Sequence, residues 1–230
     1  MTINPFRRPP QQRRTPSRLA TGLAAAGTAV ALYRWALRPW QRTWGATRTE
    51  ARRPLPGDAL APRADYETTR AITIDAPAHA IWPWLVQLGQ GRGGFYSYDW
   101  LENLFGLDIH SADRVVPEWQ EVELGDPVRM APPDQFDGVA RMDVALIESD
   151  RALVLRSPEE APDDQAASWA FVLDPVDDAT TRLIVRTRMM TTPAMRVLLD
   201  PAHFIMERKM LHGIKQRAER RTPTPTSSEE

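Results

Sequence analysis

The chain has 230 residues, of which 42% are hydrophobic, and it contains no cysteine. This length and hydrophobicity exclude a wholly disordered protein and leave room for one domain with a core and extensions. The absence of cysteine excludes disulfides, thiolate zinc sites and iron–sulfur clusters.

The net charge of −1 hides an uneven distribution along the chain. Residues 1–53 hold eleven arginines and a single acidic residue, Glu50, so the rest of the chain is acidic. Nucleic-acid-binding domains need a basic face. The acidic body therefore argues against a nucleic-acid partner.

The N-terminal segment combines a polar arm with an apolar run. Residues 1–18 are rich in Arg, Pro, Gln and Thr without periodicity, and they predict a disordered basic arm. Residues 19–37 are apolar apart from Arg34, whose charge can reach water, and we expect them to form a single-pass membrane anchor. Two alternatives stay open: a cleaved signal peptide with residues 29–31 as its A-x-A site, and an alanine-rich surface helix.

The folded domain is expected to follow a linker. Residues 38–66 contain several prolines and a Pro-Gly pair, which are turn signals typical of a linker. A β-branched strand is predicted at 69–75. An apolar helical stripe from Ile81 to Leu88 comes next, and Pro83 should kink or split this helix.

The sequence GQGRGG, residues 89–94, matches the G-x-G-x-x-G pattern of dinucleotide-binding loops. That pattern requires a strand before the glycines and a helix that begins at them. Here a helix precedes the glycines and Phe-Tyr-Ser-Tyr follows them. We therefore interpret them as a helix stop and a loop of close backbone approach, and we expect no cofactor.

The second half of the domain changes from extended segments to one helix. Residues 98–108 predict a short helix closed by Gly106. Short links join the extended segments that follow, which favours antiparallel hairpins; these segments lie at 126–131, 139–149, 152–157, 168–174 and 181–189. A long helix is predicted at about 194–220, with a disordered tail at 221–230.

This order of elements resembles the helix-grip fold of the START-like, or SRPBCC, superfamily. The stretch WPWLVQLGQGRGGFYSYDWLENLFGLDIHSADRVVPEWQ, residues 82–120, is similar to a bacterial polyketide cyclase/dehydrase-like branch, as are LPGD at 55–58 and TRAITIDAP at 69–77. The resemblance implies an α+β domain at 67–220, in which a curved antiparallel sheet wraps around the long C-terminal helix and leaves a hydrophobic cavity. It is specific for fold and weak for function, because this superfamily includes carriers, receptors and enzymes.

The implied cavity gives a set of candidate ligand-binding residues: Arg92, Phe95, Tyr96, Tyr98, Trp100, His110, Trp119, Met206 and Met210. Aromatic rings combine apolar area with a polar end, an arginine among glycines can reach a carboxylate, and methionine adapts to irregular ligands. Each type also has a structural alternative: the aromatic residues could form a core cluster, the arginine could face solvent, and the methionines could be part of ordinary core packing.

Three residues are candidates for proton transfer. His110 and Asp113 could form an acid/base pair at the cavity mouth, and Tyr96 could act from within. The alternative is a hydrogen-bonded loop histidine with a turn-capping aspartate. Glu102 could either orient a ligand or satisfy loop amides. No metal site is readable, because the four histidines show neither H-E-x-x-H nor a close carboxylate cluster.

Three functions follow from these patterns. We expect a membrane-tethered, non-catalytic protein that binds a hydrophobic small molecule such as a lipid, an isoprenoid or a polyketide-like compound. One alternative is a polyketide cyclase/dehydrase-type enzyme, in which a cavity acid or base moves a proton on the bound substrate. The other is an interaction module whose cavity is filled by side chains.

Overall fold

The computed structural model describes residues 27, 28, 30–135, 140–162 and 165–221. The chain forms two compact units, Met1–Pro39 and Trp40–Glu230. The described part of the first unit is helical and includes the π-helical turn η1, Tyr33–Leu37. None of the described helices combines the length and the apolar run needed to cross a bilayer. The predicted arm, residues 19–26 and 29 of the predicted anchor, and residues 222–230 of the predicted tail lie outside the described residues.

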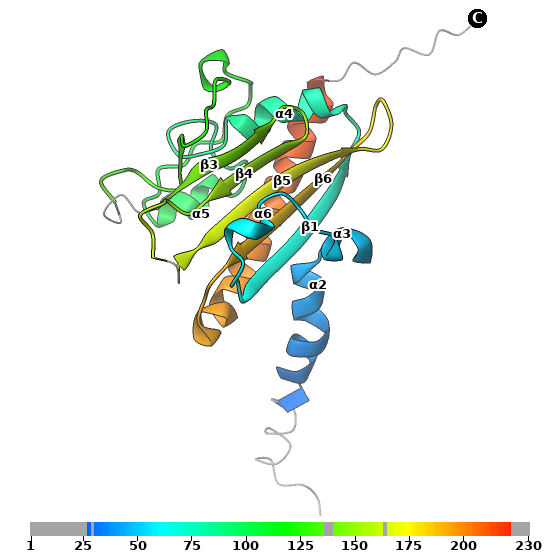
Figure 1. The fold of residues 1–230 in the computed structure, drawn as a ribbon, viewed down its shortest axis with the longest axis vertical. Helices are drawn as coiled ribbons and strands as arrows, with labels where there is room; N and C mark the ends of the chain where they lie inside the picture. The colour runs from blue at the N-terminus through cyan, green and yellow to red at the C-terminus, as the bar shows by residue number, and fades with distance from the viewer. Residues whose placement is uncertain (1–26, 29, 136–139, 163–164, 222–230) are drawn as a thin grey trace, which may run out of the picture. The chain divides into compact units, whose positions relative to one another are not determined.

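The second unit contains a six-stranded antiparallel sheet with the order β1-β6-β5-β4-β3-β2, so the last strand pairs with the first (Figure 1). Its strands are β1 Tyr66–Ile74, β2 Pro127–Arg129, β3 Arg141–Glu148, β4 Ala152–Arg156, β5 Ala167–Pro175 and β6 Thr181–Met189. The register between β3 and β4 shifts between Val144 and Leu146, a bulge that increases local bend and twist. Each predicted extended segment is confirmed as a strand.

The long helix α6, Pro193–Arg221, lies along one face of the sheet (Figure 1). It continues through Pro201 and buries Met210, Leu211 and Ile214 in the main core. Near the start of α6, Met195 is 53% exposed. The buried side of α6 begins further along the helix.

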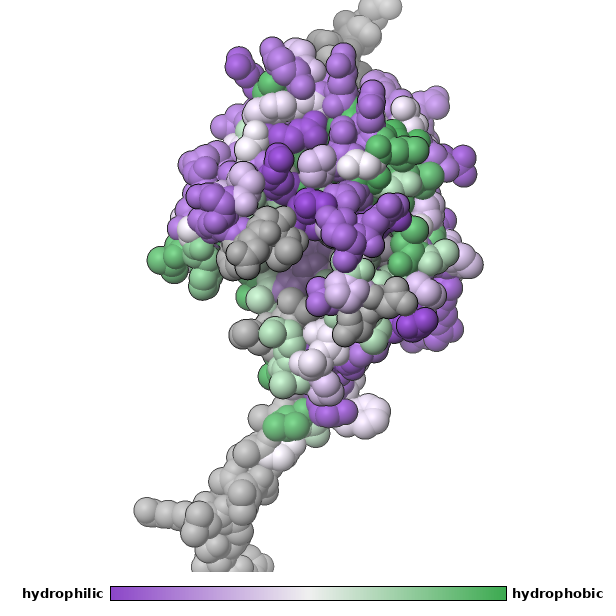
Figure 2. Space-filling view, turned by 60° about the vertical axis from the view of Figure 1, so that its left-hand side comes forward, coloured by the Kyte–Doolittle hydropathy of each residue, from purple (hydrophilic) through white to green (hydrophobic). Residues whose placement is uncertain are grey.

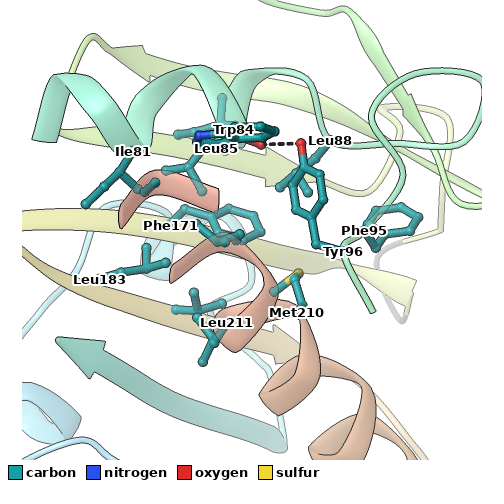
Figure 3. Packing of buried hydrophobic residues seen from close by; sticks show 14 of the residues in the cluster. Ile81, Trp84, Leu85, Leu88, Phe95, Tyr96, Phe171, Leu183, Met210 and Leu211 are labelled. Carbon is teal, nitrogen blue, oxygen red and sulfur yellow. Dashed lines mark hydrogen bonds between the residues drawn. The ribbon is translucent and has the colours of Figure 1, made fainter. Parts of the chain in front are cut away.

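A shorter helix, α4 Ala78–Val86, covers the other side of this core. Ile81, Trp84 and Leu85 of α4 pack with Phe171 of β5 and residues of α6 (Figure 3). The predicted split at Pro83 is wrong, since α4 is one helix with the proline inside it. A helix of nine residues loses a single backbone hydrogen bond there, which burial of three large side chains outweighs.

The stretch predicted as a linker is folded. Gln41 and Arg42 bond to Arg70 and Asp200 on the α6 side of the sheet, whereas the part from Ala46 onward packs on the opposite face. It contains the helices α2 Arg38–Arg42, α3 Arg48–Arg52 and η2 Asp58–Leu60. Leu55 is buried against Ala71, Val172 and Ile184, which alternate in sequence with residues of the main core and so face the other way. The linker interpretation is therefore corrected: these apolar strand residues need a cover, and this segment supplies it.

Charged side chains fasten this cover to the sheet. Arg186 of β6 is buried, and its guanidinium donates to Asp58 at 2.8 Å and to the carbonyl of Arg53 at 2.9 Å. Thr47 and Glu50 form a capping box at the start of α3. The surface of the unit is largely hydrophilic on the face shown in Figure 2, as expected when the apolar side chains are gathered inside.

The glycine-rich segment follows α4 and precedes the short helix α5, Asp99–Leu104, as predicted. Gly89 and Gly94 pair as an isolated antiparallel bridge. A side chain at Gly94, whose φ is 67°, would come within 2.8 Å of the carbonyl oxygen of His110. Gly213 of α6 is equally constrained, because a Cβ there would lie 2.3 Å from the carbonyl oxygen of Tyr96. These glycines allow close backbone approach.

Candidate functional site

A cavity of about 380 Å³ lies between α6, α5 and the strands β3, β5 and β6. Its apolar wall consists of Phe95, Leu107, Ile109, Met130, Met142, Ala167, Trp169, Met189, Met206 and Met210. Five of the chain's eight methionines are in this wall. Methionine is unbranched and polarizable, so such a wall adapts to ligands of irregular shape.

Four residues of α6 face the cavity, and they recur at the spacing of one helical stripe. His203, Met206, Glu207 and Met210 stand at i, i+3, i+4 and i+7. Met210 lies close to Phe95 from the loop before α5 (Figure 3). The sheet side contributes Ser168, Trp169 and Thr187.

Glu207 carries a buried negative charge at the α6 side of this cavity. Its side chain is 1% exposed and forms an ion pair with Arg70 of β1, which is equally buried. The Trp169 indole and the Thr187 hydroxyl donate to its Oε1 at 3.2 and 3.3 Å. His203 Nε2 lies 3.4 Å from the same oxygen. The carboxylate thus accepts three hydrogen bonds and lies beside the His203 imidazole.

These partners determine the protonation state of Glu207. Burial alone raises the pKa of a carboxyl group, but the charges of His203 and Arg70 outweigh it here and hold the pKa of Glu207 at about 2. A second layer fixes the partners in turn. The Tyr66 hydroxyl shares a hydrogen bond of 3.2 Å with His203 Nδ1, and Arg70 Nε donates to the carbonyl of Gln41 at 2.8 Å.

Glu102 of α5 is the other carboxyl group in the cavity wall. The residue is 8% exposed, and its Oε2 is buried without a hydrogen-bond partner among the described residues. Burial and, secondarily, the negative charge of Asp99 raise the pKa of Glu102 to about 7. A carboxyl group that can donate a proton near neutral pH therefore lines the cavity.

Three of the predicted ligand-binding residues line the cavity, namely Phe95, Met206 and Met210. The aromatic candidates Tyr98 and Trp100 are placed differently. The Tyr98 ring lies 5.8 Å from the Lys209 ammonium, and Trp100 is 69% exposed. Neither is among the described cavity-lining residues. The reason is geometric: a short helix has one inward face, and Glu102 occupies it on α5.

Tyr96 is buried in the core and its hydroxyl is fully used there. It donates to the carbonyl of Trp84 at 3.1 Å and accepts from Gln87 Nε2 at 2.9 Å (Figure 3). Burial raises the pKa of Tyr96 further above its usual range. Arg92 Nη2 donates to the carbonyl of Trp119 at 2.6 Å. Tyr96, Arg92 and Trp119 thus hold the loops together.

His110 and Asp113 do not form the expected acid/base pair. The His110 side chain is 77% exposed, and its Nε2 lies 3.0 Å from Asp108 Oδ1. Asp113, also exposed, pairs with Arg217 Nη2 of α6 at 3.0 Å. The backbone between them does not keep a helical period, so a spacing of three does not bring the side chains together.

The sequence interpretation missed the Glu207 cluster, although a signal for it exists. His203 and Glu207 stand at i and i+4 on the same stripe as Met206 and Met210. Two ionisable residues in an apolar helical stripe indicate a buried polar site. Their partner Arg70 stands inside a β-branched strand 137 positions earlier, where a charged residue is equally unusual. Among the residues that the structure covers, no cluster could hold a metal ion.

The architecture is that of a helix-grip fold: an antiparallel sheet, a long C-terminal helix against it and an apolar cavity between them. The predicted α+β fold is confirmed. No protein-family model matches the sequence, and no curated protein is significantly similar to it.

Solved structures similar to this chain have the same kind of fold. Zhui aromatase/cyclase from Streptomyces sp. R1128 is 16% identical over 69% of this chain and 96% of its own, with a TM-score of 0.37. A protein from Thermobifida fusca is 12% identical over 67% of this chain and 93% of its own, with a TM-score of 0.46. Norcoclaurine synthase from Thalictrum flavum is 12% identical over 75% and 97%, with a TM-score of 0.38.

Proposed function

We propose that this chain binds a hydrophobic small molecule in the cavity between α6 and the sheet. The supporting observation is the cavity itself, whose volume of about 380 Å³ falls in the range of small-molecule sites. Its wall is apolar and rich in methionine, with a few polar groups that converge on the space. A lipid, an isoprenoid or a polyketide-like compound has matching chemistry.

The volume also bears on the alternative of a filled interaction module. In a filled helix-grip core, side chains from α6 and the sheet would interdigitate at the density of an ordinary protein interior. The described side chains leave this space open instead. Binding of a guest molecule is therefore the better supported function.

An enzyme of the polyketide cyclase/dehydrase type is the second candidate, and Glu102 is the observation that favours it. The residues first considered for proton transfer are engaged elsewhere. At the surface, His110 pairs with Asp108 and Asp113 pairs with Arg217, and the Tyr96 hydroxyl is hydrogen-bonded in the core. Glu102 offers an acid with a pKa of about 7 in the cavity wall. Analysis of the bound compound for chemical conversion tests this candidate: an enzyme should convert it, and Glu102→Gln should bind it without conversion.

A matched pair of tryptophan substitutions on α6 tests the binding site. Met206→Trp should fill the cavity and weaken binding of the neutral apolar dye N-phenyl-1-naphthylamine by tenfold or more. Met195→Trp adds the same side chain at an exposed position of the same helix and should leave binding unchanged. Fluorescence titration of the two purified full-length variants gives the answer. Equal binding by Met206→Trp and the unsubstituted protein would place the site elsewhere.

Membrane association of residues 19–37 is part of this proposal. A tether at the bilayer would keep the chain next to a reservoir of apolar molecules. Full-length protein should fractionate with membranes, and a chain that begins at Trp40 should not. The deletion must stop before Gln41 and Arg42, since these residues bond to Arg70 and Asp200 of the folded unit. Soluble fractionation of the intact full-length chain would exclude the tether.

A further inference from the structure

Glu102 carries a buried Oε2 without a hydrogen-bond partner among the described residues, in a segment where the neighbouring polar side chains have partners. Asn103 accepts from the amide of Ile109 at 2.6 Å and donates to its carbonyl at 2.9 Å. Asp99 accepts from the amide and the hydroxyl of Ser111 at 2.7 and 2.6 Å. The loop amides that Glu102 could have satisfied are thus already bonded. Glu102 instead lines the cavity with Oε2 buried and unpartnered.

An unpartnered buried carboxyl group is costly unless a bound molecule completes its hydrogen bonds. We infer that Glu102 recognises a carbonyl oxygen of the bound molecule, to which its carboxylic acid donates a hydrogen bond. This inference rests on the proposed binding function and adds the chemical class of the ligand: an apolar compound that carries a ketone, an ester or an aldehyde.

The charges around the cavity favour the neutral acid as the recognising species. Asp99, on the same helix, is negative and opposes ionisation of Glu102. Across the cavity, the charge of Glu207 is compensated by Arg70 and His203. No described cation pairs with Glu102, so its protonated form persists up to neutral pH and can act as a donor.

Two naphthalenes that differ at one group test the inference. 2-Acetylnaphthalene presents a carbonyl oxygen, and 2-ethylnaphthalene has nearly the same shape without it. Both are titrated against full-length protein by displacement of N-phenyl-1-naphthylamine at pH 5.5 and 8.5. The unsubstituted protein should prefer the ketone about 3- to 10-fold at pH 5.5, the effect of one hydrogen bond, and should lose this preference at pH 8.5.

Two substitutions of Glu102 distinguish the presence of a hydrogen-bond donor from the effect of its ionisation. Glu102→Gln retains a donor that does not titrate, so its preference for the ketone should be the same at both pH values. Glu102→Leu has no donor and should bind the two probes equally at both. A pH-dependent preference that survives in Glu102→Leu would assign the effect to another group in the cavity wall, such as His203, and overturn the inference.

The remaining outcomes distinguish this inference from the proposed function. Equal binding of both probes by the unsubstituted protein would overturn the role of Glu102 and leave the cavity as a binding site. Tighter binding of 2-(2-naphthyl)ethylamine as the pH rises would show that an ionised Glu102 recognises cations, which also overturns it. Failure of all the probes to bind would remove the proposed function and this inference together.

Discussion

Glu102 and Glu207 line the same cavity, yet their environments drive the two carboxyl groups to opposite protonation states. Glu207, on α6, is held ionised by Arg70 and His203, with a pKa of about 2. Glu102, on α5, pairs with no cation among the described residues, its Oε2 accepts no hydrogen bond from them, and its pKa is about 7. Two carboxyl groups whose pKa values diverge in one pocket indicate different roles.

The difference teaches which side of the cavity is structural. The Glu207 carboxylate is satisfied without a ligand, because each of its partners comes from the chain itself, although Arg70 Nη2 is buried without a hydrogen-bond partner among the described residues. On the Glu102 side the carboxyl group itself is incomplete, since its Oε2 is buried and finds no partner in the described part of the chain. Substitutions on the first side should therefore lower stability, whereas replacement of the Glu102 carboxyl group should raise stability above its pKa and alter binding.

The largest expected effect comes from Glu207→Gln. The substitution leaves the Arg70 guanidinium buried without its counter-charge, so the free energy of unfolding should fall by about 3–5 kcal/mol. Chemical denaturation at pH 7 measures this change. Glu219→Gln is the control on the same helix, because its partly exposed pair with Lys215 should contribute only about 0–1 kcal/mol.

The sign of the pH dependence sharpens the test. The folded-state pKa of Glu207 lies below its ordinary value of 4.5, so the stability it contributes is complete above pH 4.5 and is lost as the pH falls toward 2. Glu207→Gln should flatten this acid limb of the stability curve. An unchanged loss of stability at acidic pH would show that the ion pair with Arg70 does not keep Glu207 ionised.

Glu102→Gln should change the free energy of unfolding in the opposite direction and stabilise the protein. The folded-state pKa of Glu102 is raised, so the ionised group destabilises the fold progressively between pH 4.5 and 7 and by a constant amount above. The substituted protein should match the original near pH 4.5 and exceed it by about 1–3 kcal/mol at pH 8. Denaturation curves at both pH values measure this, with the exposed Glu118→Gln as control. Equal stability at pH 8 would mean that Glu102 is solvated.

A smaller effect is expected from Tyr66→Phe in the second layer. Loss of the hydrogen bond between the Tyr66 hydroxyl and His203 should reduce the free energy of unfolding by about 0.5–1.5 kcal/mol. Thermal unfolding monitored by circular dichroism is sufficient. A much larger loss would indicate that the Glu207 side depends on this outer contact as strongly as on its ion pair.

The smallest effect should come from His110→Asn. The side chain is exposed and touches Asp108 at the surface, so stability should change by no more than about 0.5 kcal/mol, and binding of N-phenyl-1-naphthylamine should not change. Unfolding and dye titration in parallel measure both. A tenfold loss of dye binding would show that His110 takes part in binding and would contradict the difference drawn between His110 and Glu102.

The order and type of the elements could be predicted from the sequence, because they depend on local periodicity. Alternation along 181–189 marks β6, and the glycines after α4 are excluded from a dinucleotide site by the helix before them. Met206 and Met210 could be placed on the cavity face by their helical spacing. These features depend on neighbours a few residues apart, which the sequence lists directly.

The tertiary structure alone decided which polar groups meet. Arg70 and Glu207 are 137 positions apart, and their pairing depends on β1 lying beneath α6. The cover formed by 46–60 depends on apolar residues of three separate strands that share one face. His110 and Glu102 look equally eligible in sequence, but a loop has no period to set the direction of a side chain. One is at the surface and the other is in the cavity wall, because packing of α5 against the cavity turned Glu102 inward.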